Sequence, residues 1–571
     1  MAAQAKAIPS VEVPAFVDRG FIDHRNLRDL YRLAADDGEV DRRALDAQVA
    51  EIKCNLDYAA AYGITSYVLF SRGFERLICY DFLLPPAPGA PYSEQPTEEG
   101  TRPPRPEVDR TPIFSDDSDH RRQAGVFGEA VRQVIRHAHD LGIRVVFHTN
   151  QFDFPEEVYQ RYGDTLAGTA RICPARGATW RLFRGKIEEF FRRFPNCDGL
   201  QITTSETQVR VTECACDACR DLSPAERFAK MAKQAHAICH RLEKGLQFRT
   251  WGDIARPDRE PDYLAMLAAL PTDVIISTKH TSGDFHLLEP PSHLIGKGDR
   301  EQVIEFDCWG EYQGYNQFPC YRGDVFAERL RVCRDRGVRR VAARLNWNPG
   351  VRPIFEVPYG NQVNAYVFAR LAQDPDQDPE VLLRDWAEQT FPAGAVADAV
   401  ALYKFSPHAQ QAWMTLAGGN CNDHSRVFRA VGSSRTYRSR VRSQVREALE
   451  AGYEITPSGL ERRRRDIDAA YDEAAALVER LRPQVAAEWV DDLLRQADNE
   501  RQVAQCNTDA LETLYYADMA EAGRPLPDLT AFERRIRERL ATWRERDPDA
   551  YELLGGDHTL AMLKELTNPS S

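Results

Sequence analysis

Between about residues 15 and 350, the chain alternates two hydrophobic patterns. Short runs rich in β-branched and aromatic residues follow amphipathic stretches with helical spacing, and polar loops separate them. Gly63, Gly142 and Gly337 each precede such a run, where the C-terminus of a helix is expected. Alternation of strand and helix eight times predicts a (β/α)8 barrel. The predicted strands are 20–23, 65–70, 143–150, 198–206, 246–253, 273–280, 303–307 and 338–347.

An open doubly wound sheet is the main alternative. Such a sheet usually carries a Gly-rich phosphate loop after its first strand, and none follows here. After about residue 360 the strand pattern ends and helical spacing takes over. We expect a barrel over 1–355, with a Pro-rich loop at about 85–112, and an all-helical domain over 356–571. One buried helical stripe is predicted at Ile467, Tyr471, Ala474, Val478 and Leu481.

The composition narrows the class of protein. A chain of 571 residues is too long for one ordinary core, which agrees with two domains. The net charge of −13 argues against a nucleic-acid or anionic-membrane partner, and the basic run at 461–466 is expected to be a solvated helix face. No apolar run is long enough to span a membrane and no signal peptide is recognised, so a cytoplasmic location is expected. Thirteen cysteines, an odd number, favour reduced thiols.

The ends of the predicted strands carry most of the candidate chemistry, as in barrels of this kind. They combine carboxylates, cations, amides and aromatic rings, a mixture typical of a carbohydrate site. The acidic candidates are Glu206, Asp284 and Glu311. The candidates for substrate binding are Asn150, Arg249, Trp251, Lys279, His280, Trp309 and Trp347.

The segment "VIEFDCWGEYQGYNQFP" (303–319) places Glu305, Asp307 and Glu311 among five aromatic rings. Charged groups beside apolar rings cost solvation free energy unless they are paired or used in chemistry. A solvated acidic rim over a packed core is the simpler interpretation. Glu305 is expected to face the barrel interior or to support neighbouring residues.

Several segments, in order and at similar spacing, resemble the α-glucuronidases of glycoside hydrolase family 67. The resemblance runs with gaps from about 50 to 390. It rests on "YAAAYGITSYVLF", "DGLQITTSET", "KHTSGDFHLLEPPSHL", "EFDCWGEYQG" and "GNQVNAYVFARLAQDPD".

The resemblance implies roles for individual residues. Glu206 would be the general acid that protonates the leaving oxygen, and Asp284 and Glu311 would hold and deprotonate the attacking water. The family inverts the anomeric centre, which requires carboxyl groups about 6.5–9.5 Å apart. Lys279 and Arg249 would match residues that bind the carboxylate of a terminal uronic acid on an oligosaccharide. The helical domain would mediate a homodimer, and no cofactor is implied.

The chain also departs from the family. Ile202 stands where the family carries a lysine that helps to bind the uronic acid, and the family's N-terminal β-rich domain has no counterpart. A barrel glycosidase for a neutral or amino sugar is therefore an alternative, as is a carbohydrate-binding barrel without turnover. Three acids argue against the last alternative, because a pure binding site does not need them.

The segment "ECACDACR" places Cys214, Cys216 and Cys219 in a loop beyond Glu206. This C-x-C-x2-C spacing could supply three thiolates to a structural zinc, with Cys173 or Cys197 as the fourth ligand. Alternatively, three thiols merely share a loop. No catalytic metal is expected, because the cluster has no His or carboxylate at the spacing of an open site.

Overall fold

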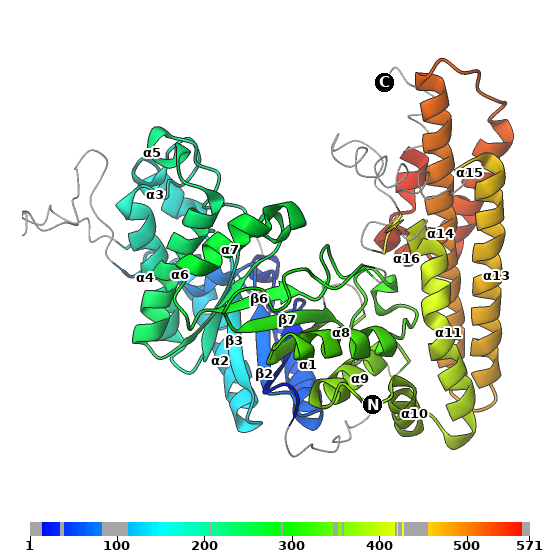
Figure 1. Ribbon diagram of the computed structural model, residues 1–571, viewed down its shortest axis with the longest axis horizontal. Helices are drawn as coiled ribbons and strands as arrows, with labels where there is room; N and C mark the ends of the chain where they lie inside the picture. Colours follow the sequence, from blue (N-terminus) through cyan, green and yellow to red (C-terminus); the bar gives the residue numbers. More distant parts are fainter. Residues whose placement is uncertain are drawn as a thin grey trace, which may run out of the picture.

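The computed structural model describes residues 14–34, 39–82, 112–205, 207–286, 289–346, 352–356, 359–416, 419–420, 425–427 and 455–561. Eight strands close into a parallel barrel in chain order (Figure 1). The barrel predicted from the sequence is confirmed, and pairing of β8 with β1 excludes the open sheet. The strands are β1 (Asp18–Asp23), β2 (Ser66–Phe70), β3 (Arg144–Thr149), β4 (Gly199–Thr203), β5 (Gly245–Arg249), β6 (Ile275–Lys279), β7 (Gln302–Asp307) and β8 (Arg340–Asn346).

Helices cover the outside of the barrel (Figure 1). Local signals set their ends: Ser223 and Glu226 form a capping box at the start of α6, and Gly142 takes a positive φ of 73° just after α2. No described helix is both long enough and apolar enough to cross a bilayer. The α-helices are α1 (Arg42–Ala61), α2 (Asp119–Asp140), α3 (Glu156–Leu166), α4 (Gly177–Arg193), α5 (Asp217–Arg220), α6 (Pro224–Arg241), α7 (Glu260–Ala269), α8 (Gly323–Asp335) and α9 (Gln362–Gln373). Short 3-10 turns are η1 (Leu30–Leu33), η2 (Phe74–Leu77), η3 (Asp253–Ala255), η4 (Pro257–Arg259) and η5 (Gly314–Asn316).

The barrel interior changes from apolar to polar along the strands. Strand side chains alternate between the interior and the surrounding helices. Near the carboxyl ends of β6 and β7 the interior is polar, and the Ser277 hydroxyl donates a hydrogen bond of 2.5 Å to Glu305. The polar end of the interior is therefore the end where the candidate site lies. The apolar interior cluster consists of Ile22, Val68, Val146, Val303 and Ala342.

The region after the barrel is helical, as predicted (Figure 1). Every residue of the predicted stripe is buried on α13, which packs against α11 and α14. The expectation that strands end at residue 360 is wrong in one detail. Residues 415–416 (β9) and 419–420 (β10) pair antiparallel, and two residues are too few to show alternation. The Pro-rich segment 85–112 lies outside the described residues, apart from Pro112. The helices are α10 (Pro379–Thr390), η6 (Ala393–Ala395), α11 (Val396–Met414), α13 (Pro457–Leu481), α14 (Ala487–Glu521), α15 (Thr530–Arg546) and α16 (Pro548–Leu554).

The basic run at 461–466 is not wholly a solvated face. Arg463 and Arg464 are buried on α13, whereas their neighbours in the run are exposed. Arg464 pairs with Asp509 at 2.8 Å and with Glu512 at 2.5 Å. Acids on α14 thus compensate the buried charge, which the sequence of α13 alone does not reveal.

A buried carboxyl group connects the helical region to the loop after β7. Glu500 accepts hydrogen bonds from Gln410 at 2.5 Å and from Tyr471 at 3.2 Å. It approaches Gly314 so closely that a Cβ there would overlap its Oε1 atom. Burial raises the pKa of Glu500 to about 8, so this carboxyl is mostly protonated at neutral pH.

Replacing Glu500 with glutamine should flatten the pH dependence of folding stability. Above the ordinary pKa of 4.5 the unfolded chain releases a proton that folded Glu500 retains up to about pH 8. The stabilisation that Glu500 contributes is therefore full below pH 4.5 and falls by roughly 1.4 kcal/mol per pH unit until about pH 8. Glutamine has no proton to release. Denaturant unfolding across this range measures both slopes, and an equal slope in Glu500→Gln would contradict the assignment.

Candidate active site

Apart from Asn150, which follows β3, the described site candidates gather where strands β5 to β7 end. Asp284 lies in the loop after β6 and Glu311 in the loop after β7. Arg249 and Lys279 are the last residues of β5 and β6, and Trp251 follows β5. Glu206 and Trp347 lie outside the described residues.

Asp284 is held by a cation and a phenol. Its carboxylate forms an ion pair with Lys279 and accepts a hydrogen bond of 2.9 Å from the Tyr312 hydroxyl. Burial alone would raise the pKa of Asp284, but the charges of Lys279 and Arg344 outweigh it and hold the pKa well below its usual range. The low pKa therefore favours the carboxylate form of Asp284 at physiological pH.

Glu311 shares the Arg344 guanidinium with Asp307. Arg344 lies 2.5 Å from the carboxylate of Glu311 and 3.3 Å from that of Asp307. All three side chains are almost fully buried. Arg344 also lowers the pKa of Asp284, so its positive charge acts on both Asp284 and Glu311. The arrangement presents two carboxylates to one region of the barrel mouth.

Backbone contacts fix the loop that carries Glu311. Asp307 accepts hydrogen bonds from the N–H groups of Trp309, Gly310 and Glu311 at 2.9–3.1 Å. From the helical region, the Ser425 hydroxyl donates to the carbonyl of Glu311 and accepts from the N–H of Gly314, both at 2.9 Å. Both the barrel strand and the helical region therefore position Glu311.

Arg249 lies in a buried ion pair inside the barrel. Its Nε donates to both carboxylate oxygens of Glu305, at 2.8 and 3.0 Å. Burial would raise the pKa of Glu305, but Arg249 and the Ser277 hydroxyl lower it below the usual value. Glu305 thus faces the interior, as one of the sequence interpretations expected, and it compensates the charge of Arg249.

Two aromatic rings surround the ammonium group of Lys279. Its Nζ lies 3.2 Å from the centroid of the Trp251 ring and 4.6 Å from that of Phe285. Cation–π contacts in a shielded site are worth about 0.5–2 kcal/mol. Trp251 is half-buried, so part of its surface faces solvent near Asp284.

Asn150 orients the chain just beyond Glu206. Its amide donates to Asp153 at 2.7 Å, and Asp153 accepts from the Thr207 hydroxyl at 2.8 Å and the Val209 N–H at 3.0 Å. The Oδ1 atom of Asn150 is buried and makes no hydrogen bond within the described part of the chain. Asn150 therefore helps to position Asp153 and the chain that Asp153 holds, while its own Oδ1 atom accepts no hydrogen bond from the described residues.

The structure places two predicted substrate-binding side chains in the core. His280 is fully buried and stacks on Phe306, with ring centroids 4.7 Å apart. Trp309 is fully buried, stacks near Tyr315 and donates to the carbonyl of Arg352 at 3.0 Å. Both rings pack against protein on their faces, so the structure gives them a packing role.

Sequence reasoning missed three contributors to the site. These are Arg344, Tyr312 and the pairing of Asp307 with Arg344. Strand pairing places Asp307 opposite Arg344. The one available signal was an arginine between Ala343 and Leu345 in an otherwise apolar stretch of a predicted strand. Tyr312 had no signal of its own, because its partner Asp284 lies in a different loop.

The described charges of the site compensate one another. Lys279 pairs with Asp284, Arg249 pairs with Glu305, and Arg344 pairs with both Asp307 and Glu311. Among these seven side chains the carboxylates exceed the cations by one. An anionic ligand would therefore have to compete with an acidic partner for each of these three cations.

Two side-chain clusters among the described residues have spacing compatible with a metal ion. One consists of Cys173, Cys214, Cys216 and Cys219. The second candidate for a fourth ligand, Cys197, instead donates to backbone carbonyls of the barrel. The other cluster consists of Cys79, Asp81 and Glu189, whose acids already accept backbone and arginine hydrogen bonds.

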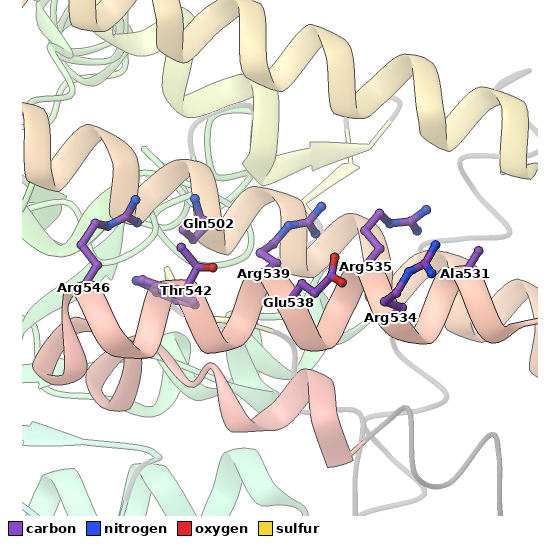
Figure 2. A pocket seen from close by; sticks show the side chains of 9 residues that line it. Gln502, Ala531, Arg534, Arg535, Glu538, Arg539, Thr542 and Arg546 are labelled. Atoms are coloured by element: carbon purple, nitrogen blue, oxygen red, sulfur yellow. The ribbon is translucent and has the colours of Figure 1, made fainter.

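A cleft of about 490 Å³ lies in the helical region, lined mainly by α15 (Figure 2). Figure 2 shows Arg534, Arg535, Arg539 and Arg546 along this helix. Acids of α14 compensate three of these four charges: Arg535 and Arg539 both pair with Asp509, and Arg546 pairs with Asp498. The cleft has no combination of acid, base and aromatic rings comparable to that at the barrel mouth.

Comparison with known proteins shows the fold. No protein-family model matches the chain, and no curated protein matches it. A glycoside hydrolase family 138 enzyme that targets the pectin rhamnogalacturonan II is similar in structure, with a TM-score of 0.58 and 12% identity. That match covers 97% of this chain, which spans only 62% of the enzyme's length.

Two further solved structures are more distant. A point mutant of the O-GlcNAc hydrolase of Thermobaculum terrenum has a TM-score of 0.41 and 12% identity, covering 97% of this chain and 95% of that one. CpGH84B has a TM-score of 0.41 and 10% identity, covering 94% and 74%. At such identities the likeness concerns the fold, and the site has to be argued from its own geometry.

Proposed function

We propose that this protein is a glycoside hydrolase whose site lies at the carboxyl end of the barrel. The observation that carries the proposal is the placement of two carboxylates at the barrel mouth. Glu311 pairs with Arg344, whose charge also lowers the pKa of Asp284, and Asp284 pairs with Lys279 over the half-buried ring of Trp251. Paired carboxylates and an aromatic platform are what hydrolysis of a glycosidic bond requires. The similarity in fold to a family 138 enzyme supports it.

The proposed mechanism is inverting. Asp284 and Glu311 would orient and deprotonate the attacking water from one face of the sugar, and Glu206 would protonate the leaving oxygen from the other. The lowered pKa of Asp284 supports this division, because an acid catalyst must carry a proton at working pH. The acid role then falls to a different residue, and Glu206 follows strand β4 in the chain.

Pairing of the cations favours a neutral terminal sugar over a uronic acid. A substrate carboxylate would have to compete with Asp284 for Lys279 and with Glu305 for Arg249. It would also add negative charge beside these ion pairs, in which four carboxylates face three cations. An α-glucuronidase is the second candidate, supported by the position of Lys279 at the mouth beside Trp251.

A change in specificity distinguishes the two candidates. If the sugar is neutral, Lys279→Met should act only by removing the ionic partner of Asp284. It should then lower kcat/KM to the same degree for an aryl glycoside and the matching aryl uronide. If the sugar is a uronic acid, the variant should lower activity on the uronide by about ten- to a hundredfold more. The ratio of the two kcat/KM values is the readout. Lys297→Met, at a half-exposed lysine paired with Glu260, is the matched control and should leave both values unchanged.

The proposal includes a homodimer formed through the helical region and a cytoplasmic location. None of the described cysteines forms a disulfide, as is usual in a reducing compartment. Light scattering at micromolar concentration should give twice the chain mass of 64.8 kDa. A mass of one chain would contradict the dimer.

A further inference from the structure

Four cysteine side chains converge on one point beside the barrel. Cys214, Cys216 and Cys219 come from the loop between β4 and α6, and Cys173 comes from the segment between α3 and α4. All four sulfur atoms lie within 4.8 Å of one another. The Cys173 sulfur is 3.6 Å from that of Cys216 and 3.5 Å from that of Cys219.

These separations fit a metal ion rather than a disulfide. Four sulfurs at the Zn–S distance of about 2.3 Å in a tetrahedron are about 3.8 Å apart, whereas bonded sulfurs are about 2.05 Å apart. The ligand set is all thiolate, closed and mostly buried, as in structural zinc sites. We propose that Cys173, Cys214, Cys216 and Cys219 bind one structural Zn²⁺.

The surroundings of the cluster are built to hold thiolates. The Thr169 hydroxyl donates a hydrogen bond to the Cys214 sulfur at 3.7 Å, and its oxygen accepts one from the N–H of Ala215 in the ligand loop at 2.6 Å. Hydrogen bonds of this kind orient and stabilise thiolate ligands. Gly168 leaves the space that the cluster occupies, because a Cβ there would lie 2.5 Å from the Cys214 sulfur.

A buried guanidinium fixes the ligand loop from the outside. Arg227 of α6 donates to the carbonyls of Thr212 and Cys214, at 3.0 and 2.7 Å, and also to that of Cys219. Its positive charge also offsets part of the negative charge that four thiolates and one Zn²⁺ leave. The loop thus presents its carbonyls to Arg227 and its sulfurs to the metal.

The metal explains how an otherwise irregular loop is ordered. Between the end of β4 and the start of α6, the described residues contain only the four-residue helix α5. Ordering such a loop costs roughly 1–2 kcal/mol per residue in backbone entropy, and a bound structural metal offsets costs of this kind. The ion would also tie this loop to the segment after α3.

The site has a consequence that rests on the proposed function. Glu206 lies at the start of the same loop, between β4 and the ligands. Asp153 holds the chain directly after it, and zinc would fix the rest. Zinc would then position the proposed general acid without contacting the substrate.

Metal analysis of reduced protein purified without chelator tests the proposal. One zinc per chain is expected, and Cys214→Ser and Cys173→Ser should lose it. Loss of a ligand should weaken binding by more than the roughly 10–100-fold that outer partners cost. Cys197→Ala, which removes the sulfur that the structure leaves out of the cluster, should retain the metal. Retention in Cys173→Ser with loss in Cys197→Ala would overturn the assignment.

Cobalt substitution in the wild-type protein keeps the test valid if a variant fails to fold. The absorption spectrum of the cobalt-loaded protein should show the visible ligand-field bands of tetrahedral Co²⁺ and charge-transfer bands from its thiolate ligands. Folded, reduced wild-type protein without zinc, or with all four thiols open to alkylation, would overturn the site. Neither readout depends on turnover, so a protein that binds zinc but hydrolyses no glycoside would refute the proposed function alone.

Discussion

Glu206→Gln should slow hydrolysis of glycosides with poor leaving groups by about 10²–10⁴-fold. Departure of a sugar alkoxide requires a proton, and in the proposed mechanism only Glu206 supplies it. A dinitrophenyl leaving group needs no proton, so the same variant should lose much less activity on the dinitrophenyl glycoside. Measuring kcat/KM of both substrates for wild type and variant gives the comparison.

Glu213→Gln is the matched control, since Glu213 is exposed in the same loop. It should behave as wild type on both substrates. If Glu206→Gln slowed the two substrates equally, Glu206 would not be the general acid.

Asp284→Asn and Glu311→Gln should each reduce turnover by a similar factor, again about 10²–10⁴-fold, but on both substrates. Water must be activated whichever group leaves. The structure sharpens the expectation for Asp284, because its low pKa keeps it from acting as the acid. Initial rates on the disaccharide and dinitrophenyl substrates measure the pattern.

Asp299→Asn provides the control, because Asp299 is an acid with a side chain 83% exposed. It should leave both rates unchanged. Selective loss on the poor leaving group in Asp284→Asn would instead identify Asp284 as a proton donor and reverse the proposed roles.

Periodicity was enough to predict the barrel. Every predicted strand overlaps an observed one, because buried parallel strands are apolar and the helices between them keep their own spacing. Gly63, Gly142 and Gly337 take positive φ as helix C-termini require. The burial of Arg463 and Arg464 was missed, since their partners Thr508, Asp509 and Glu512 belong to another helix.

The candidate site was predictable in location but not in its pairings. Sequence alone placed Lys279, Asp284 and Glu311 at strand ends. The pairing of Lys279 with Asp284, and the role of Arg344, depend on which loops meet across the barrel mouth. Successive side chains of a strand point to opposite faces, so only one of the adjacent residues Lys279 and His280 is expected to face the barrel interior.

The proposed zinc ligands, too, could be predicted from the sequence only in part. The C-x-C-x2-C spacing identified Cys214, Cys216 and Cys219, but a choice between Cys173 and Cys197 required the fold. Cys173 lies 43 residues before Cys216 in the chain, and the loops after α3 and β4 bring them together. Cys197 is nearer in sequence, yet it faces backbone carbonyls of the barrel.

The most direct test of the inverting glycosidase is proton NMR of the sugar released first. A panel of aryl α-glycosides, neutral and uronic, is offered to the wild-type protein, and the hydrolysed one is followed before mutarotation. The account predicts that the β-anomer appears first and the α-anomer only later. Release of the α-anomer first, or no hydrolysis of any glycoside by folded protein, would contradict it.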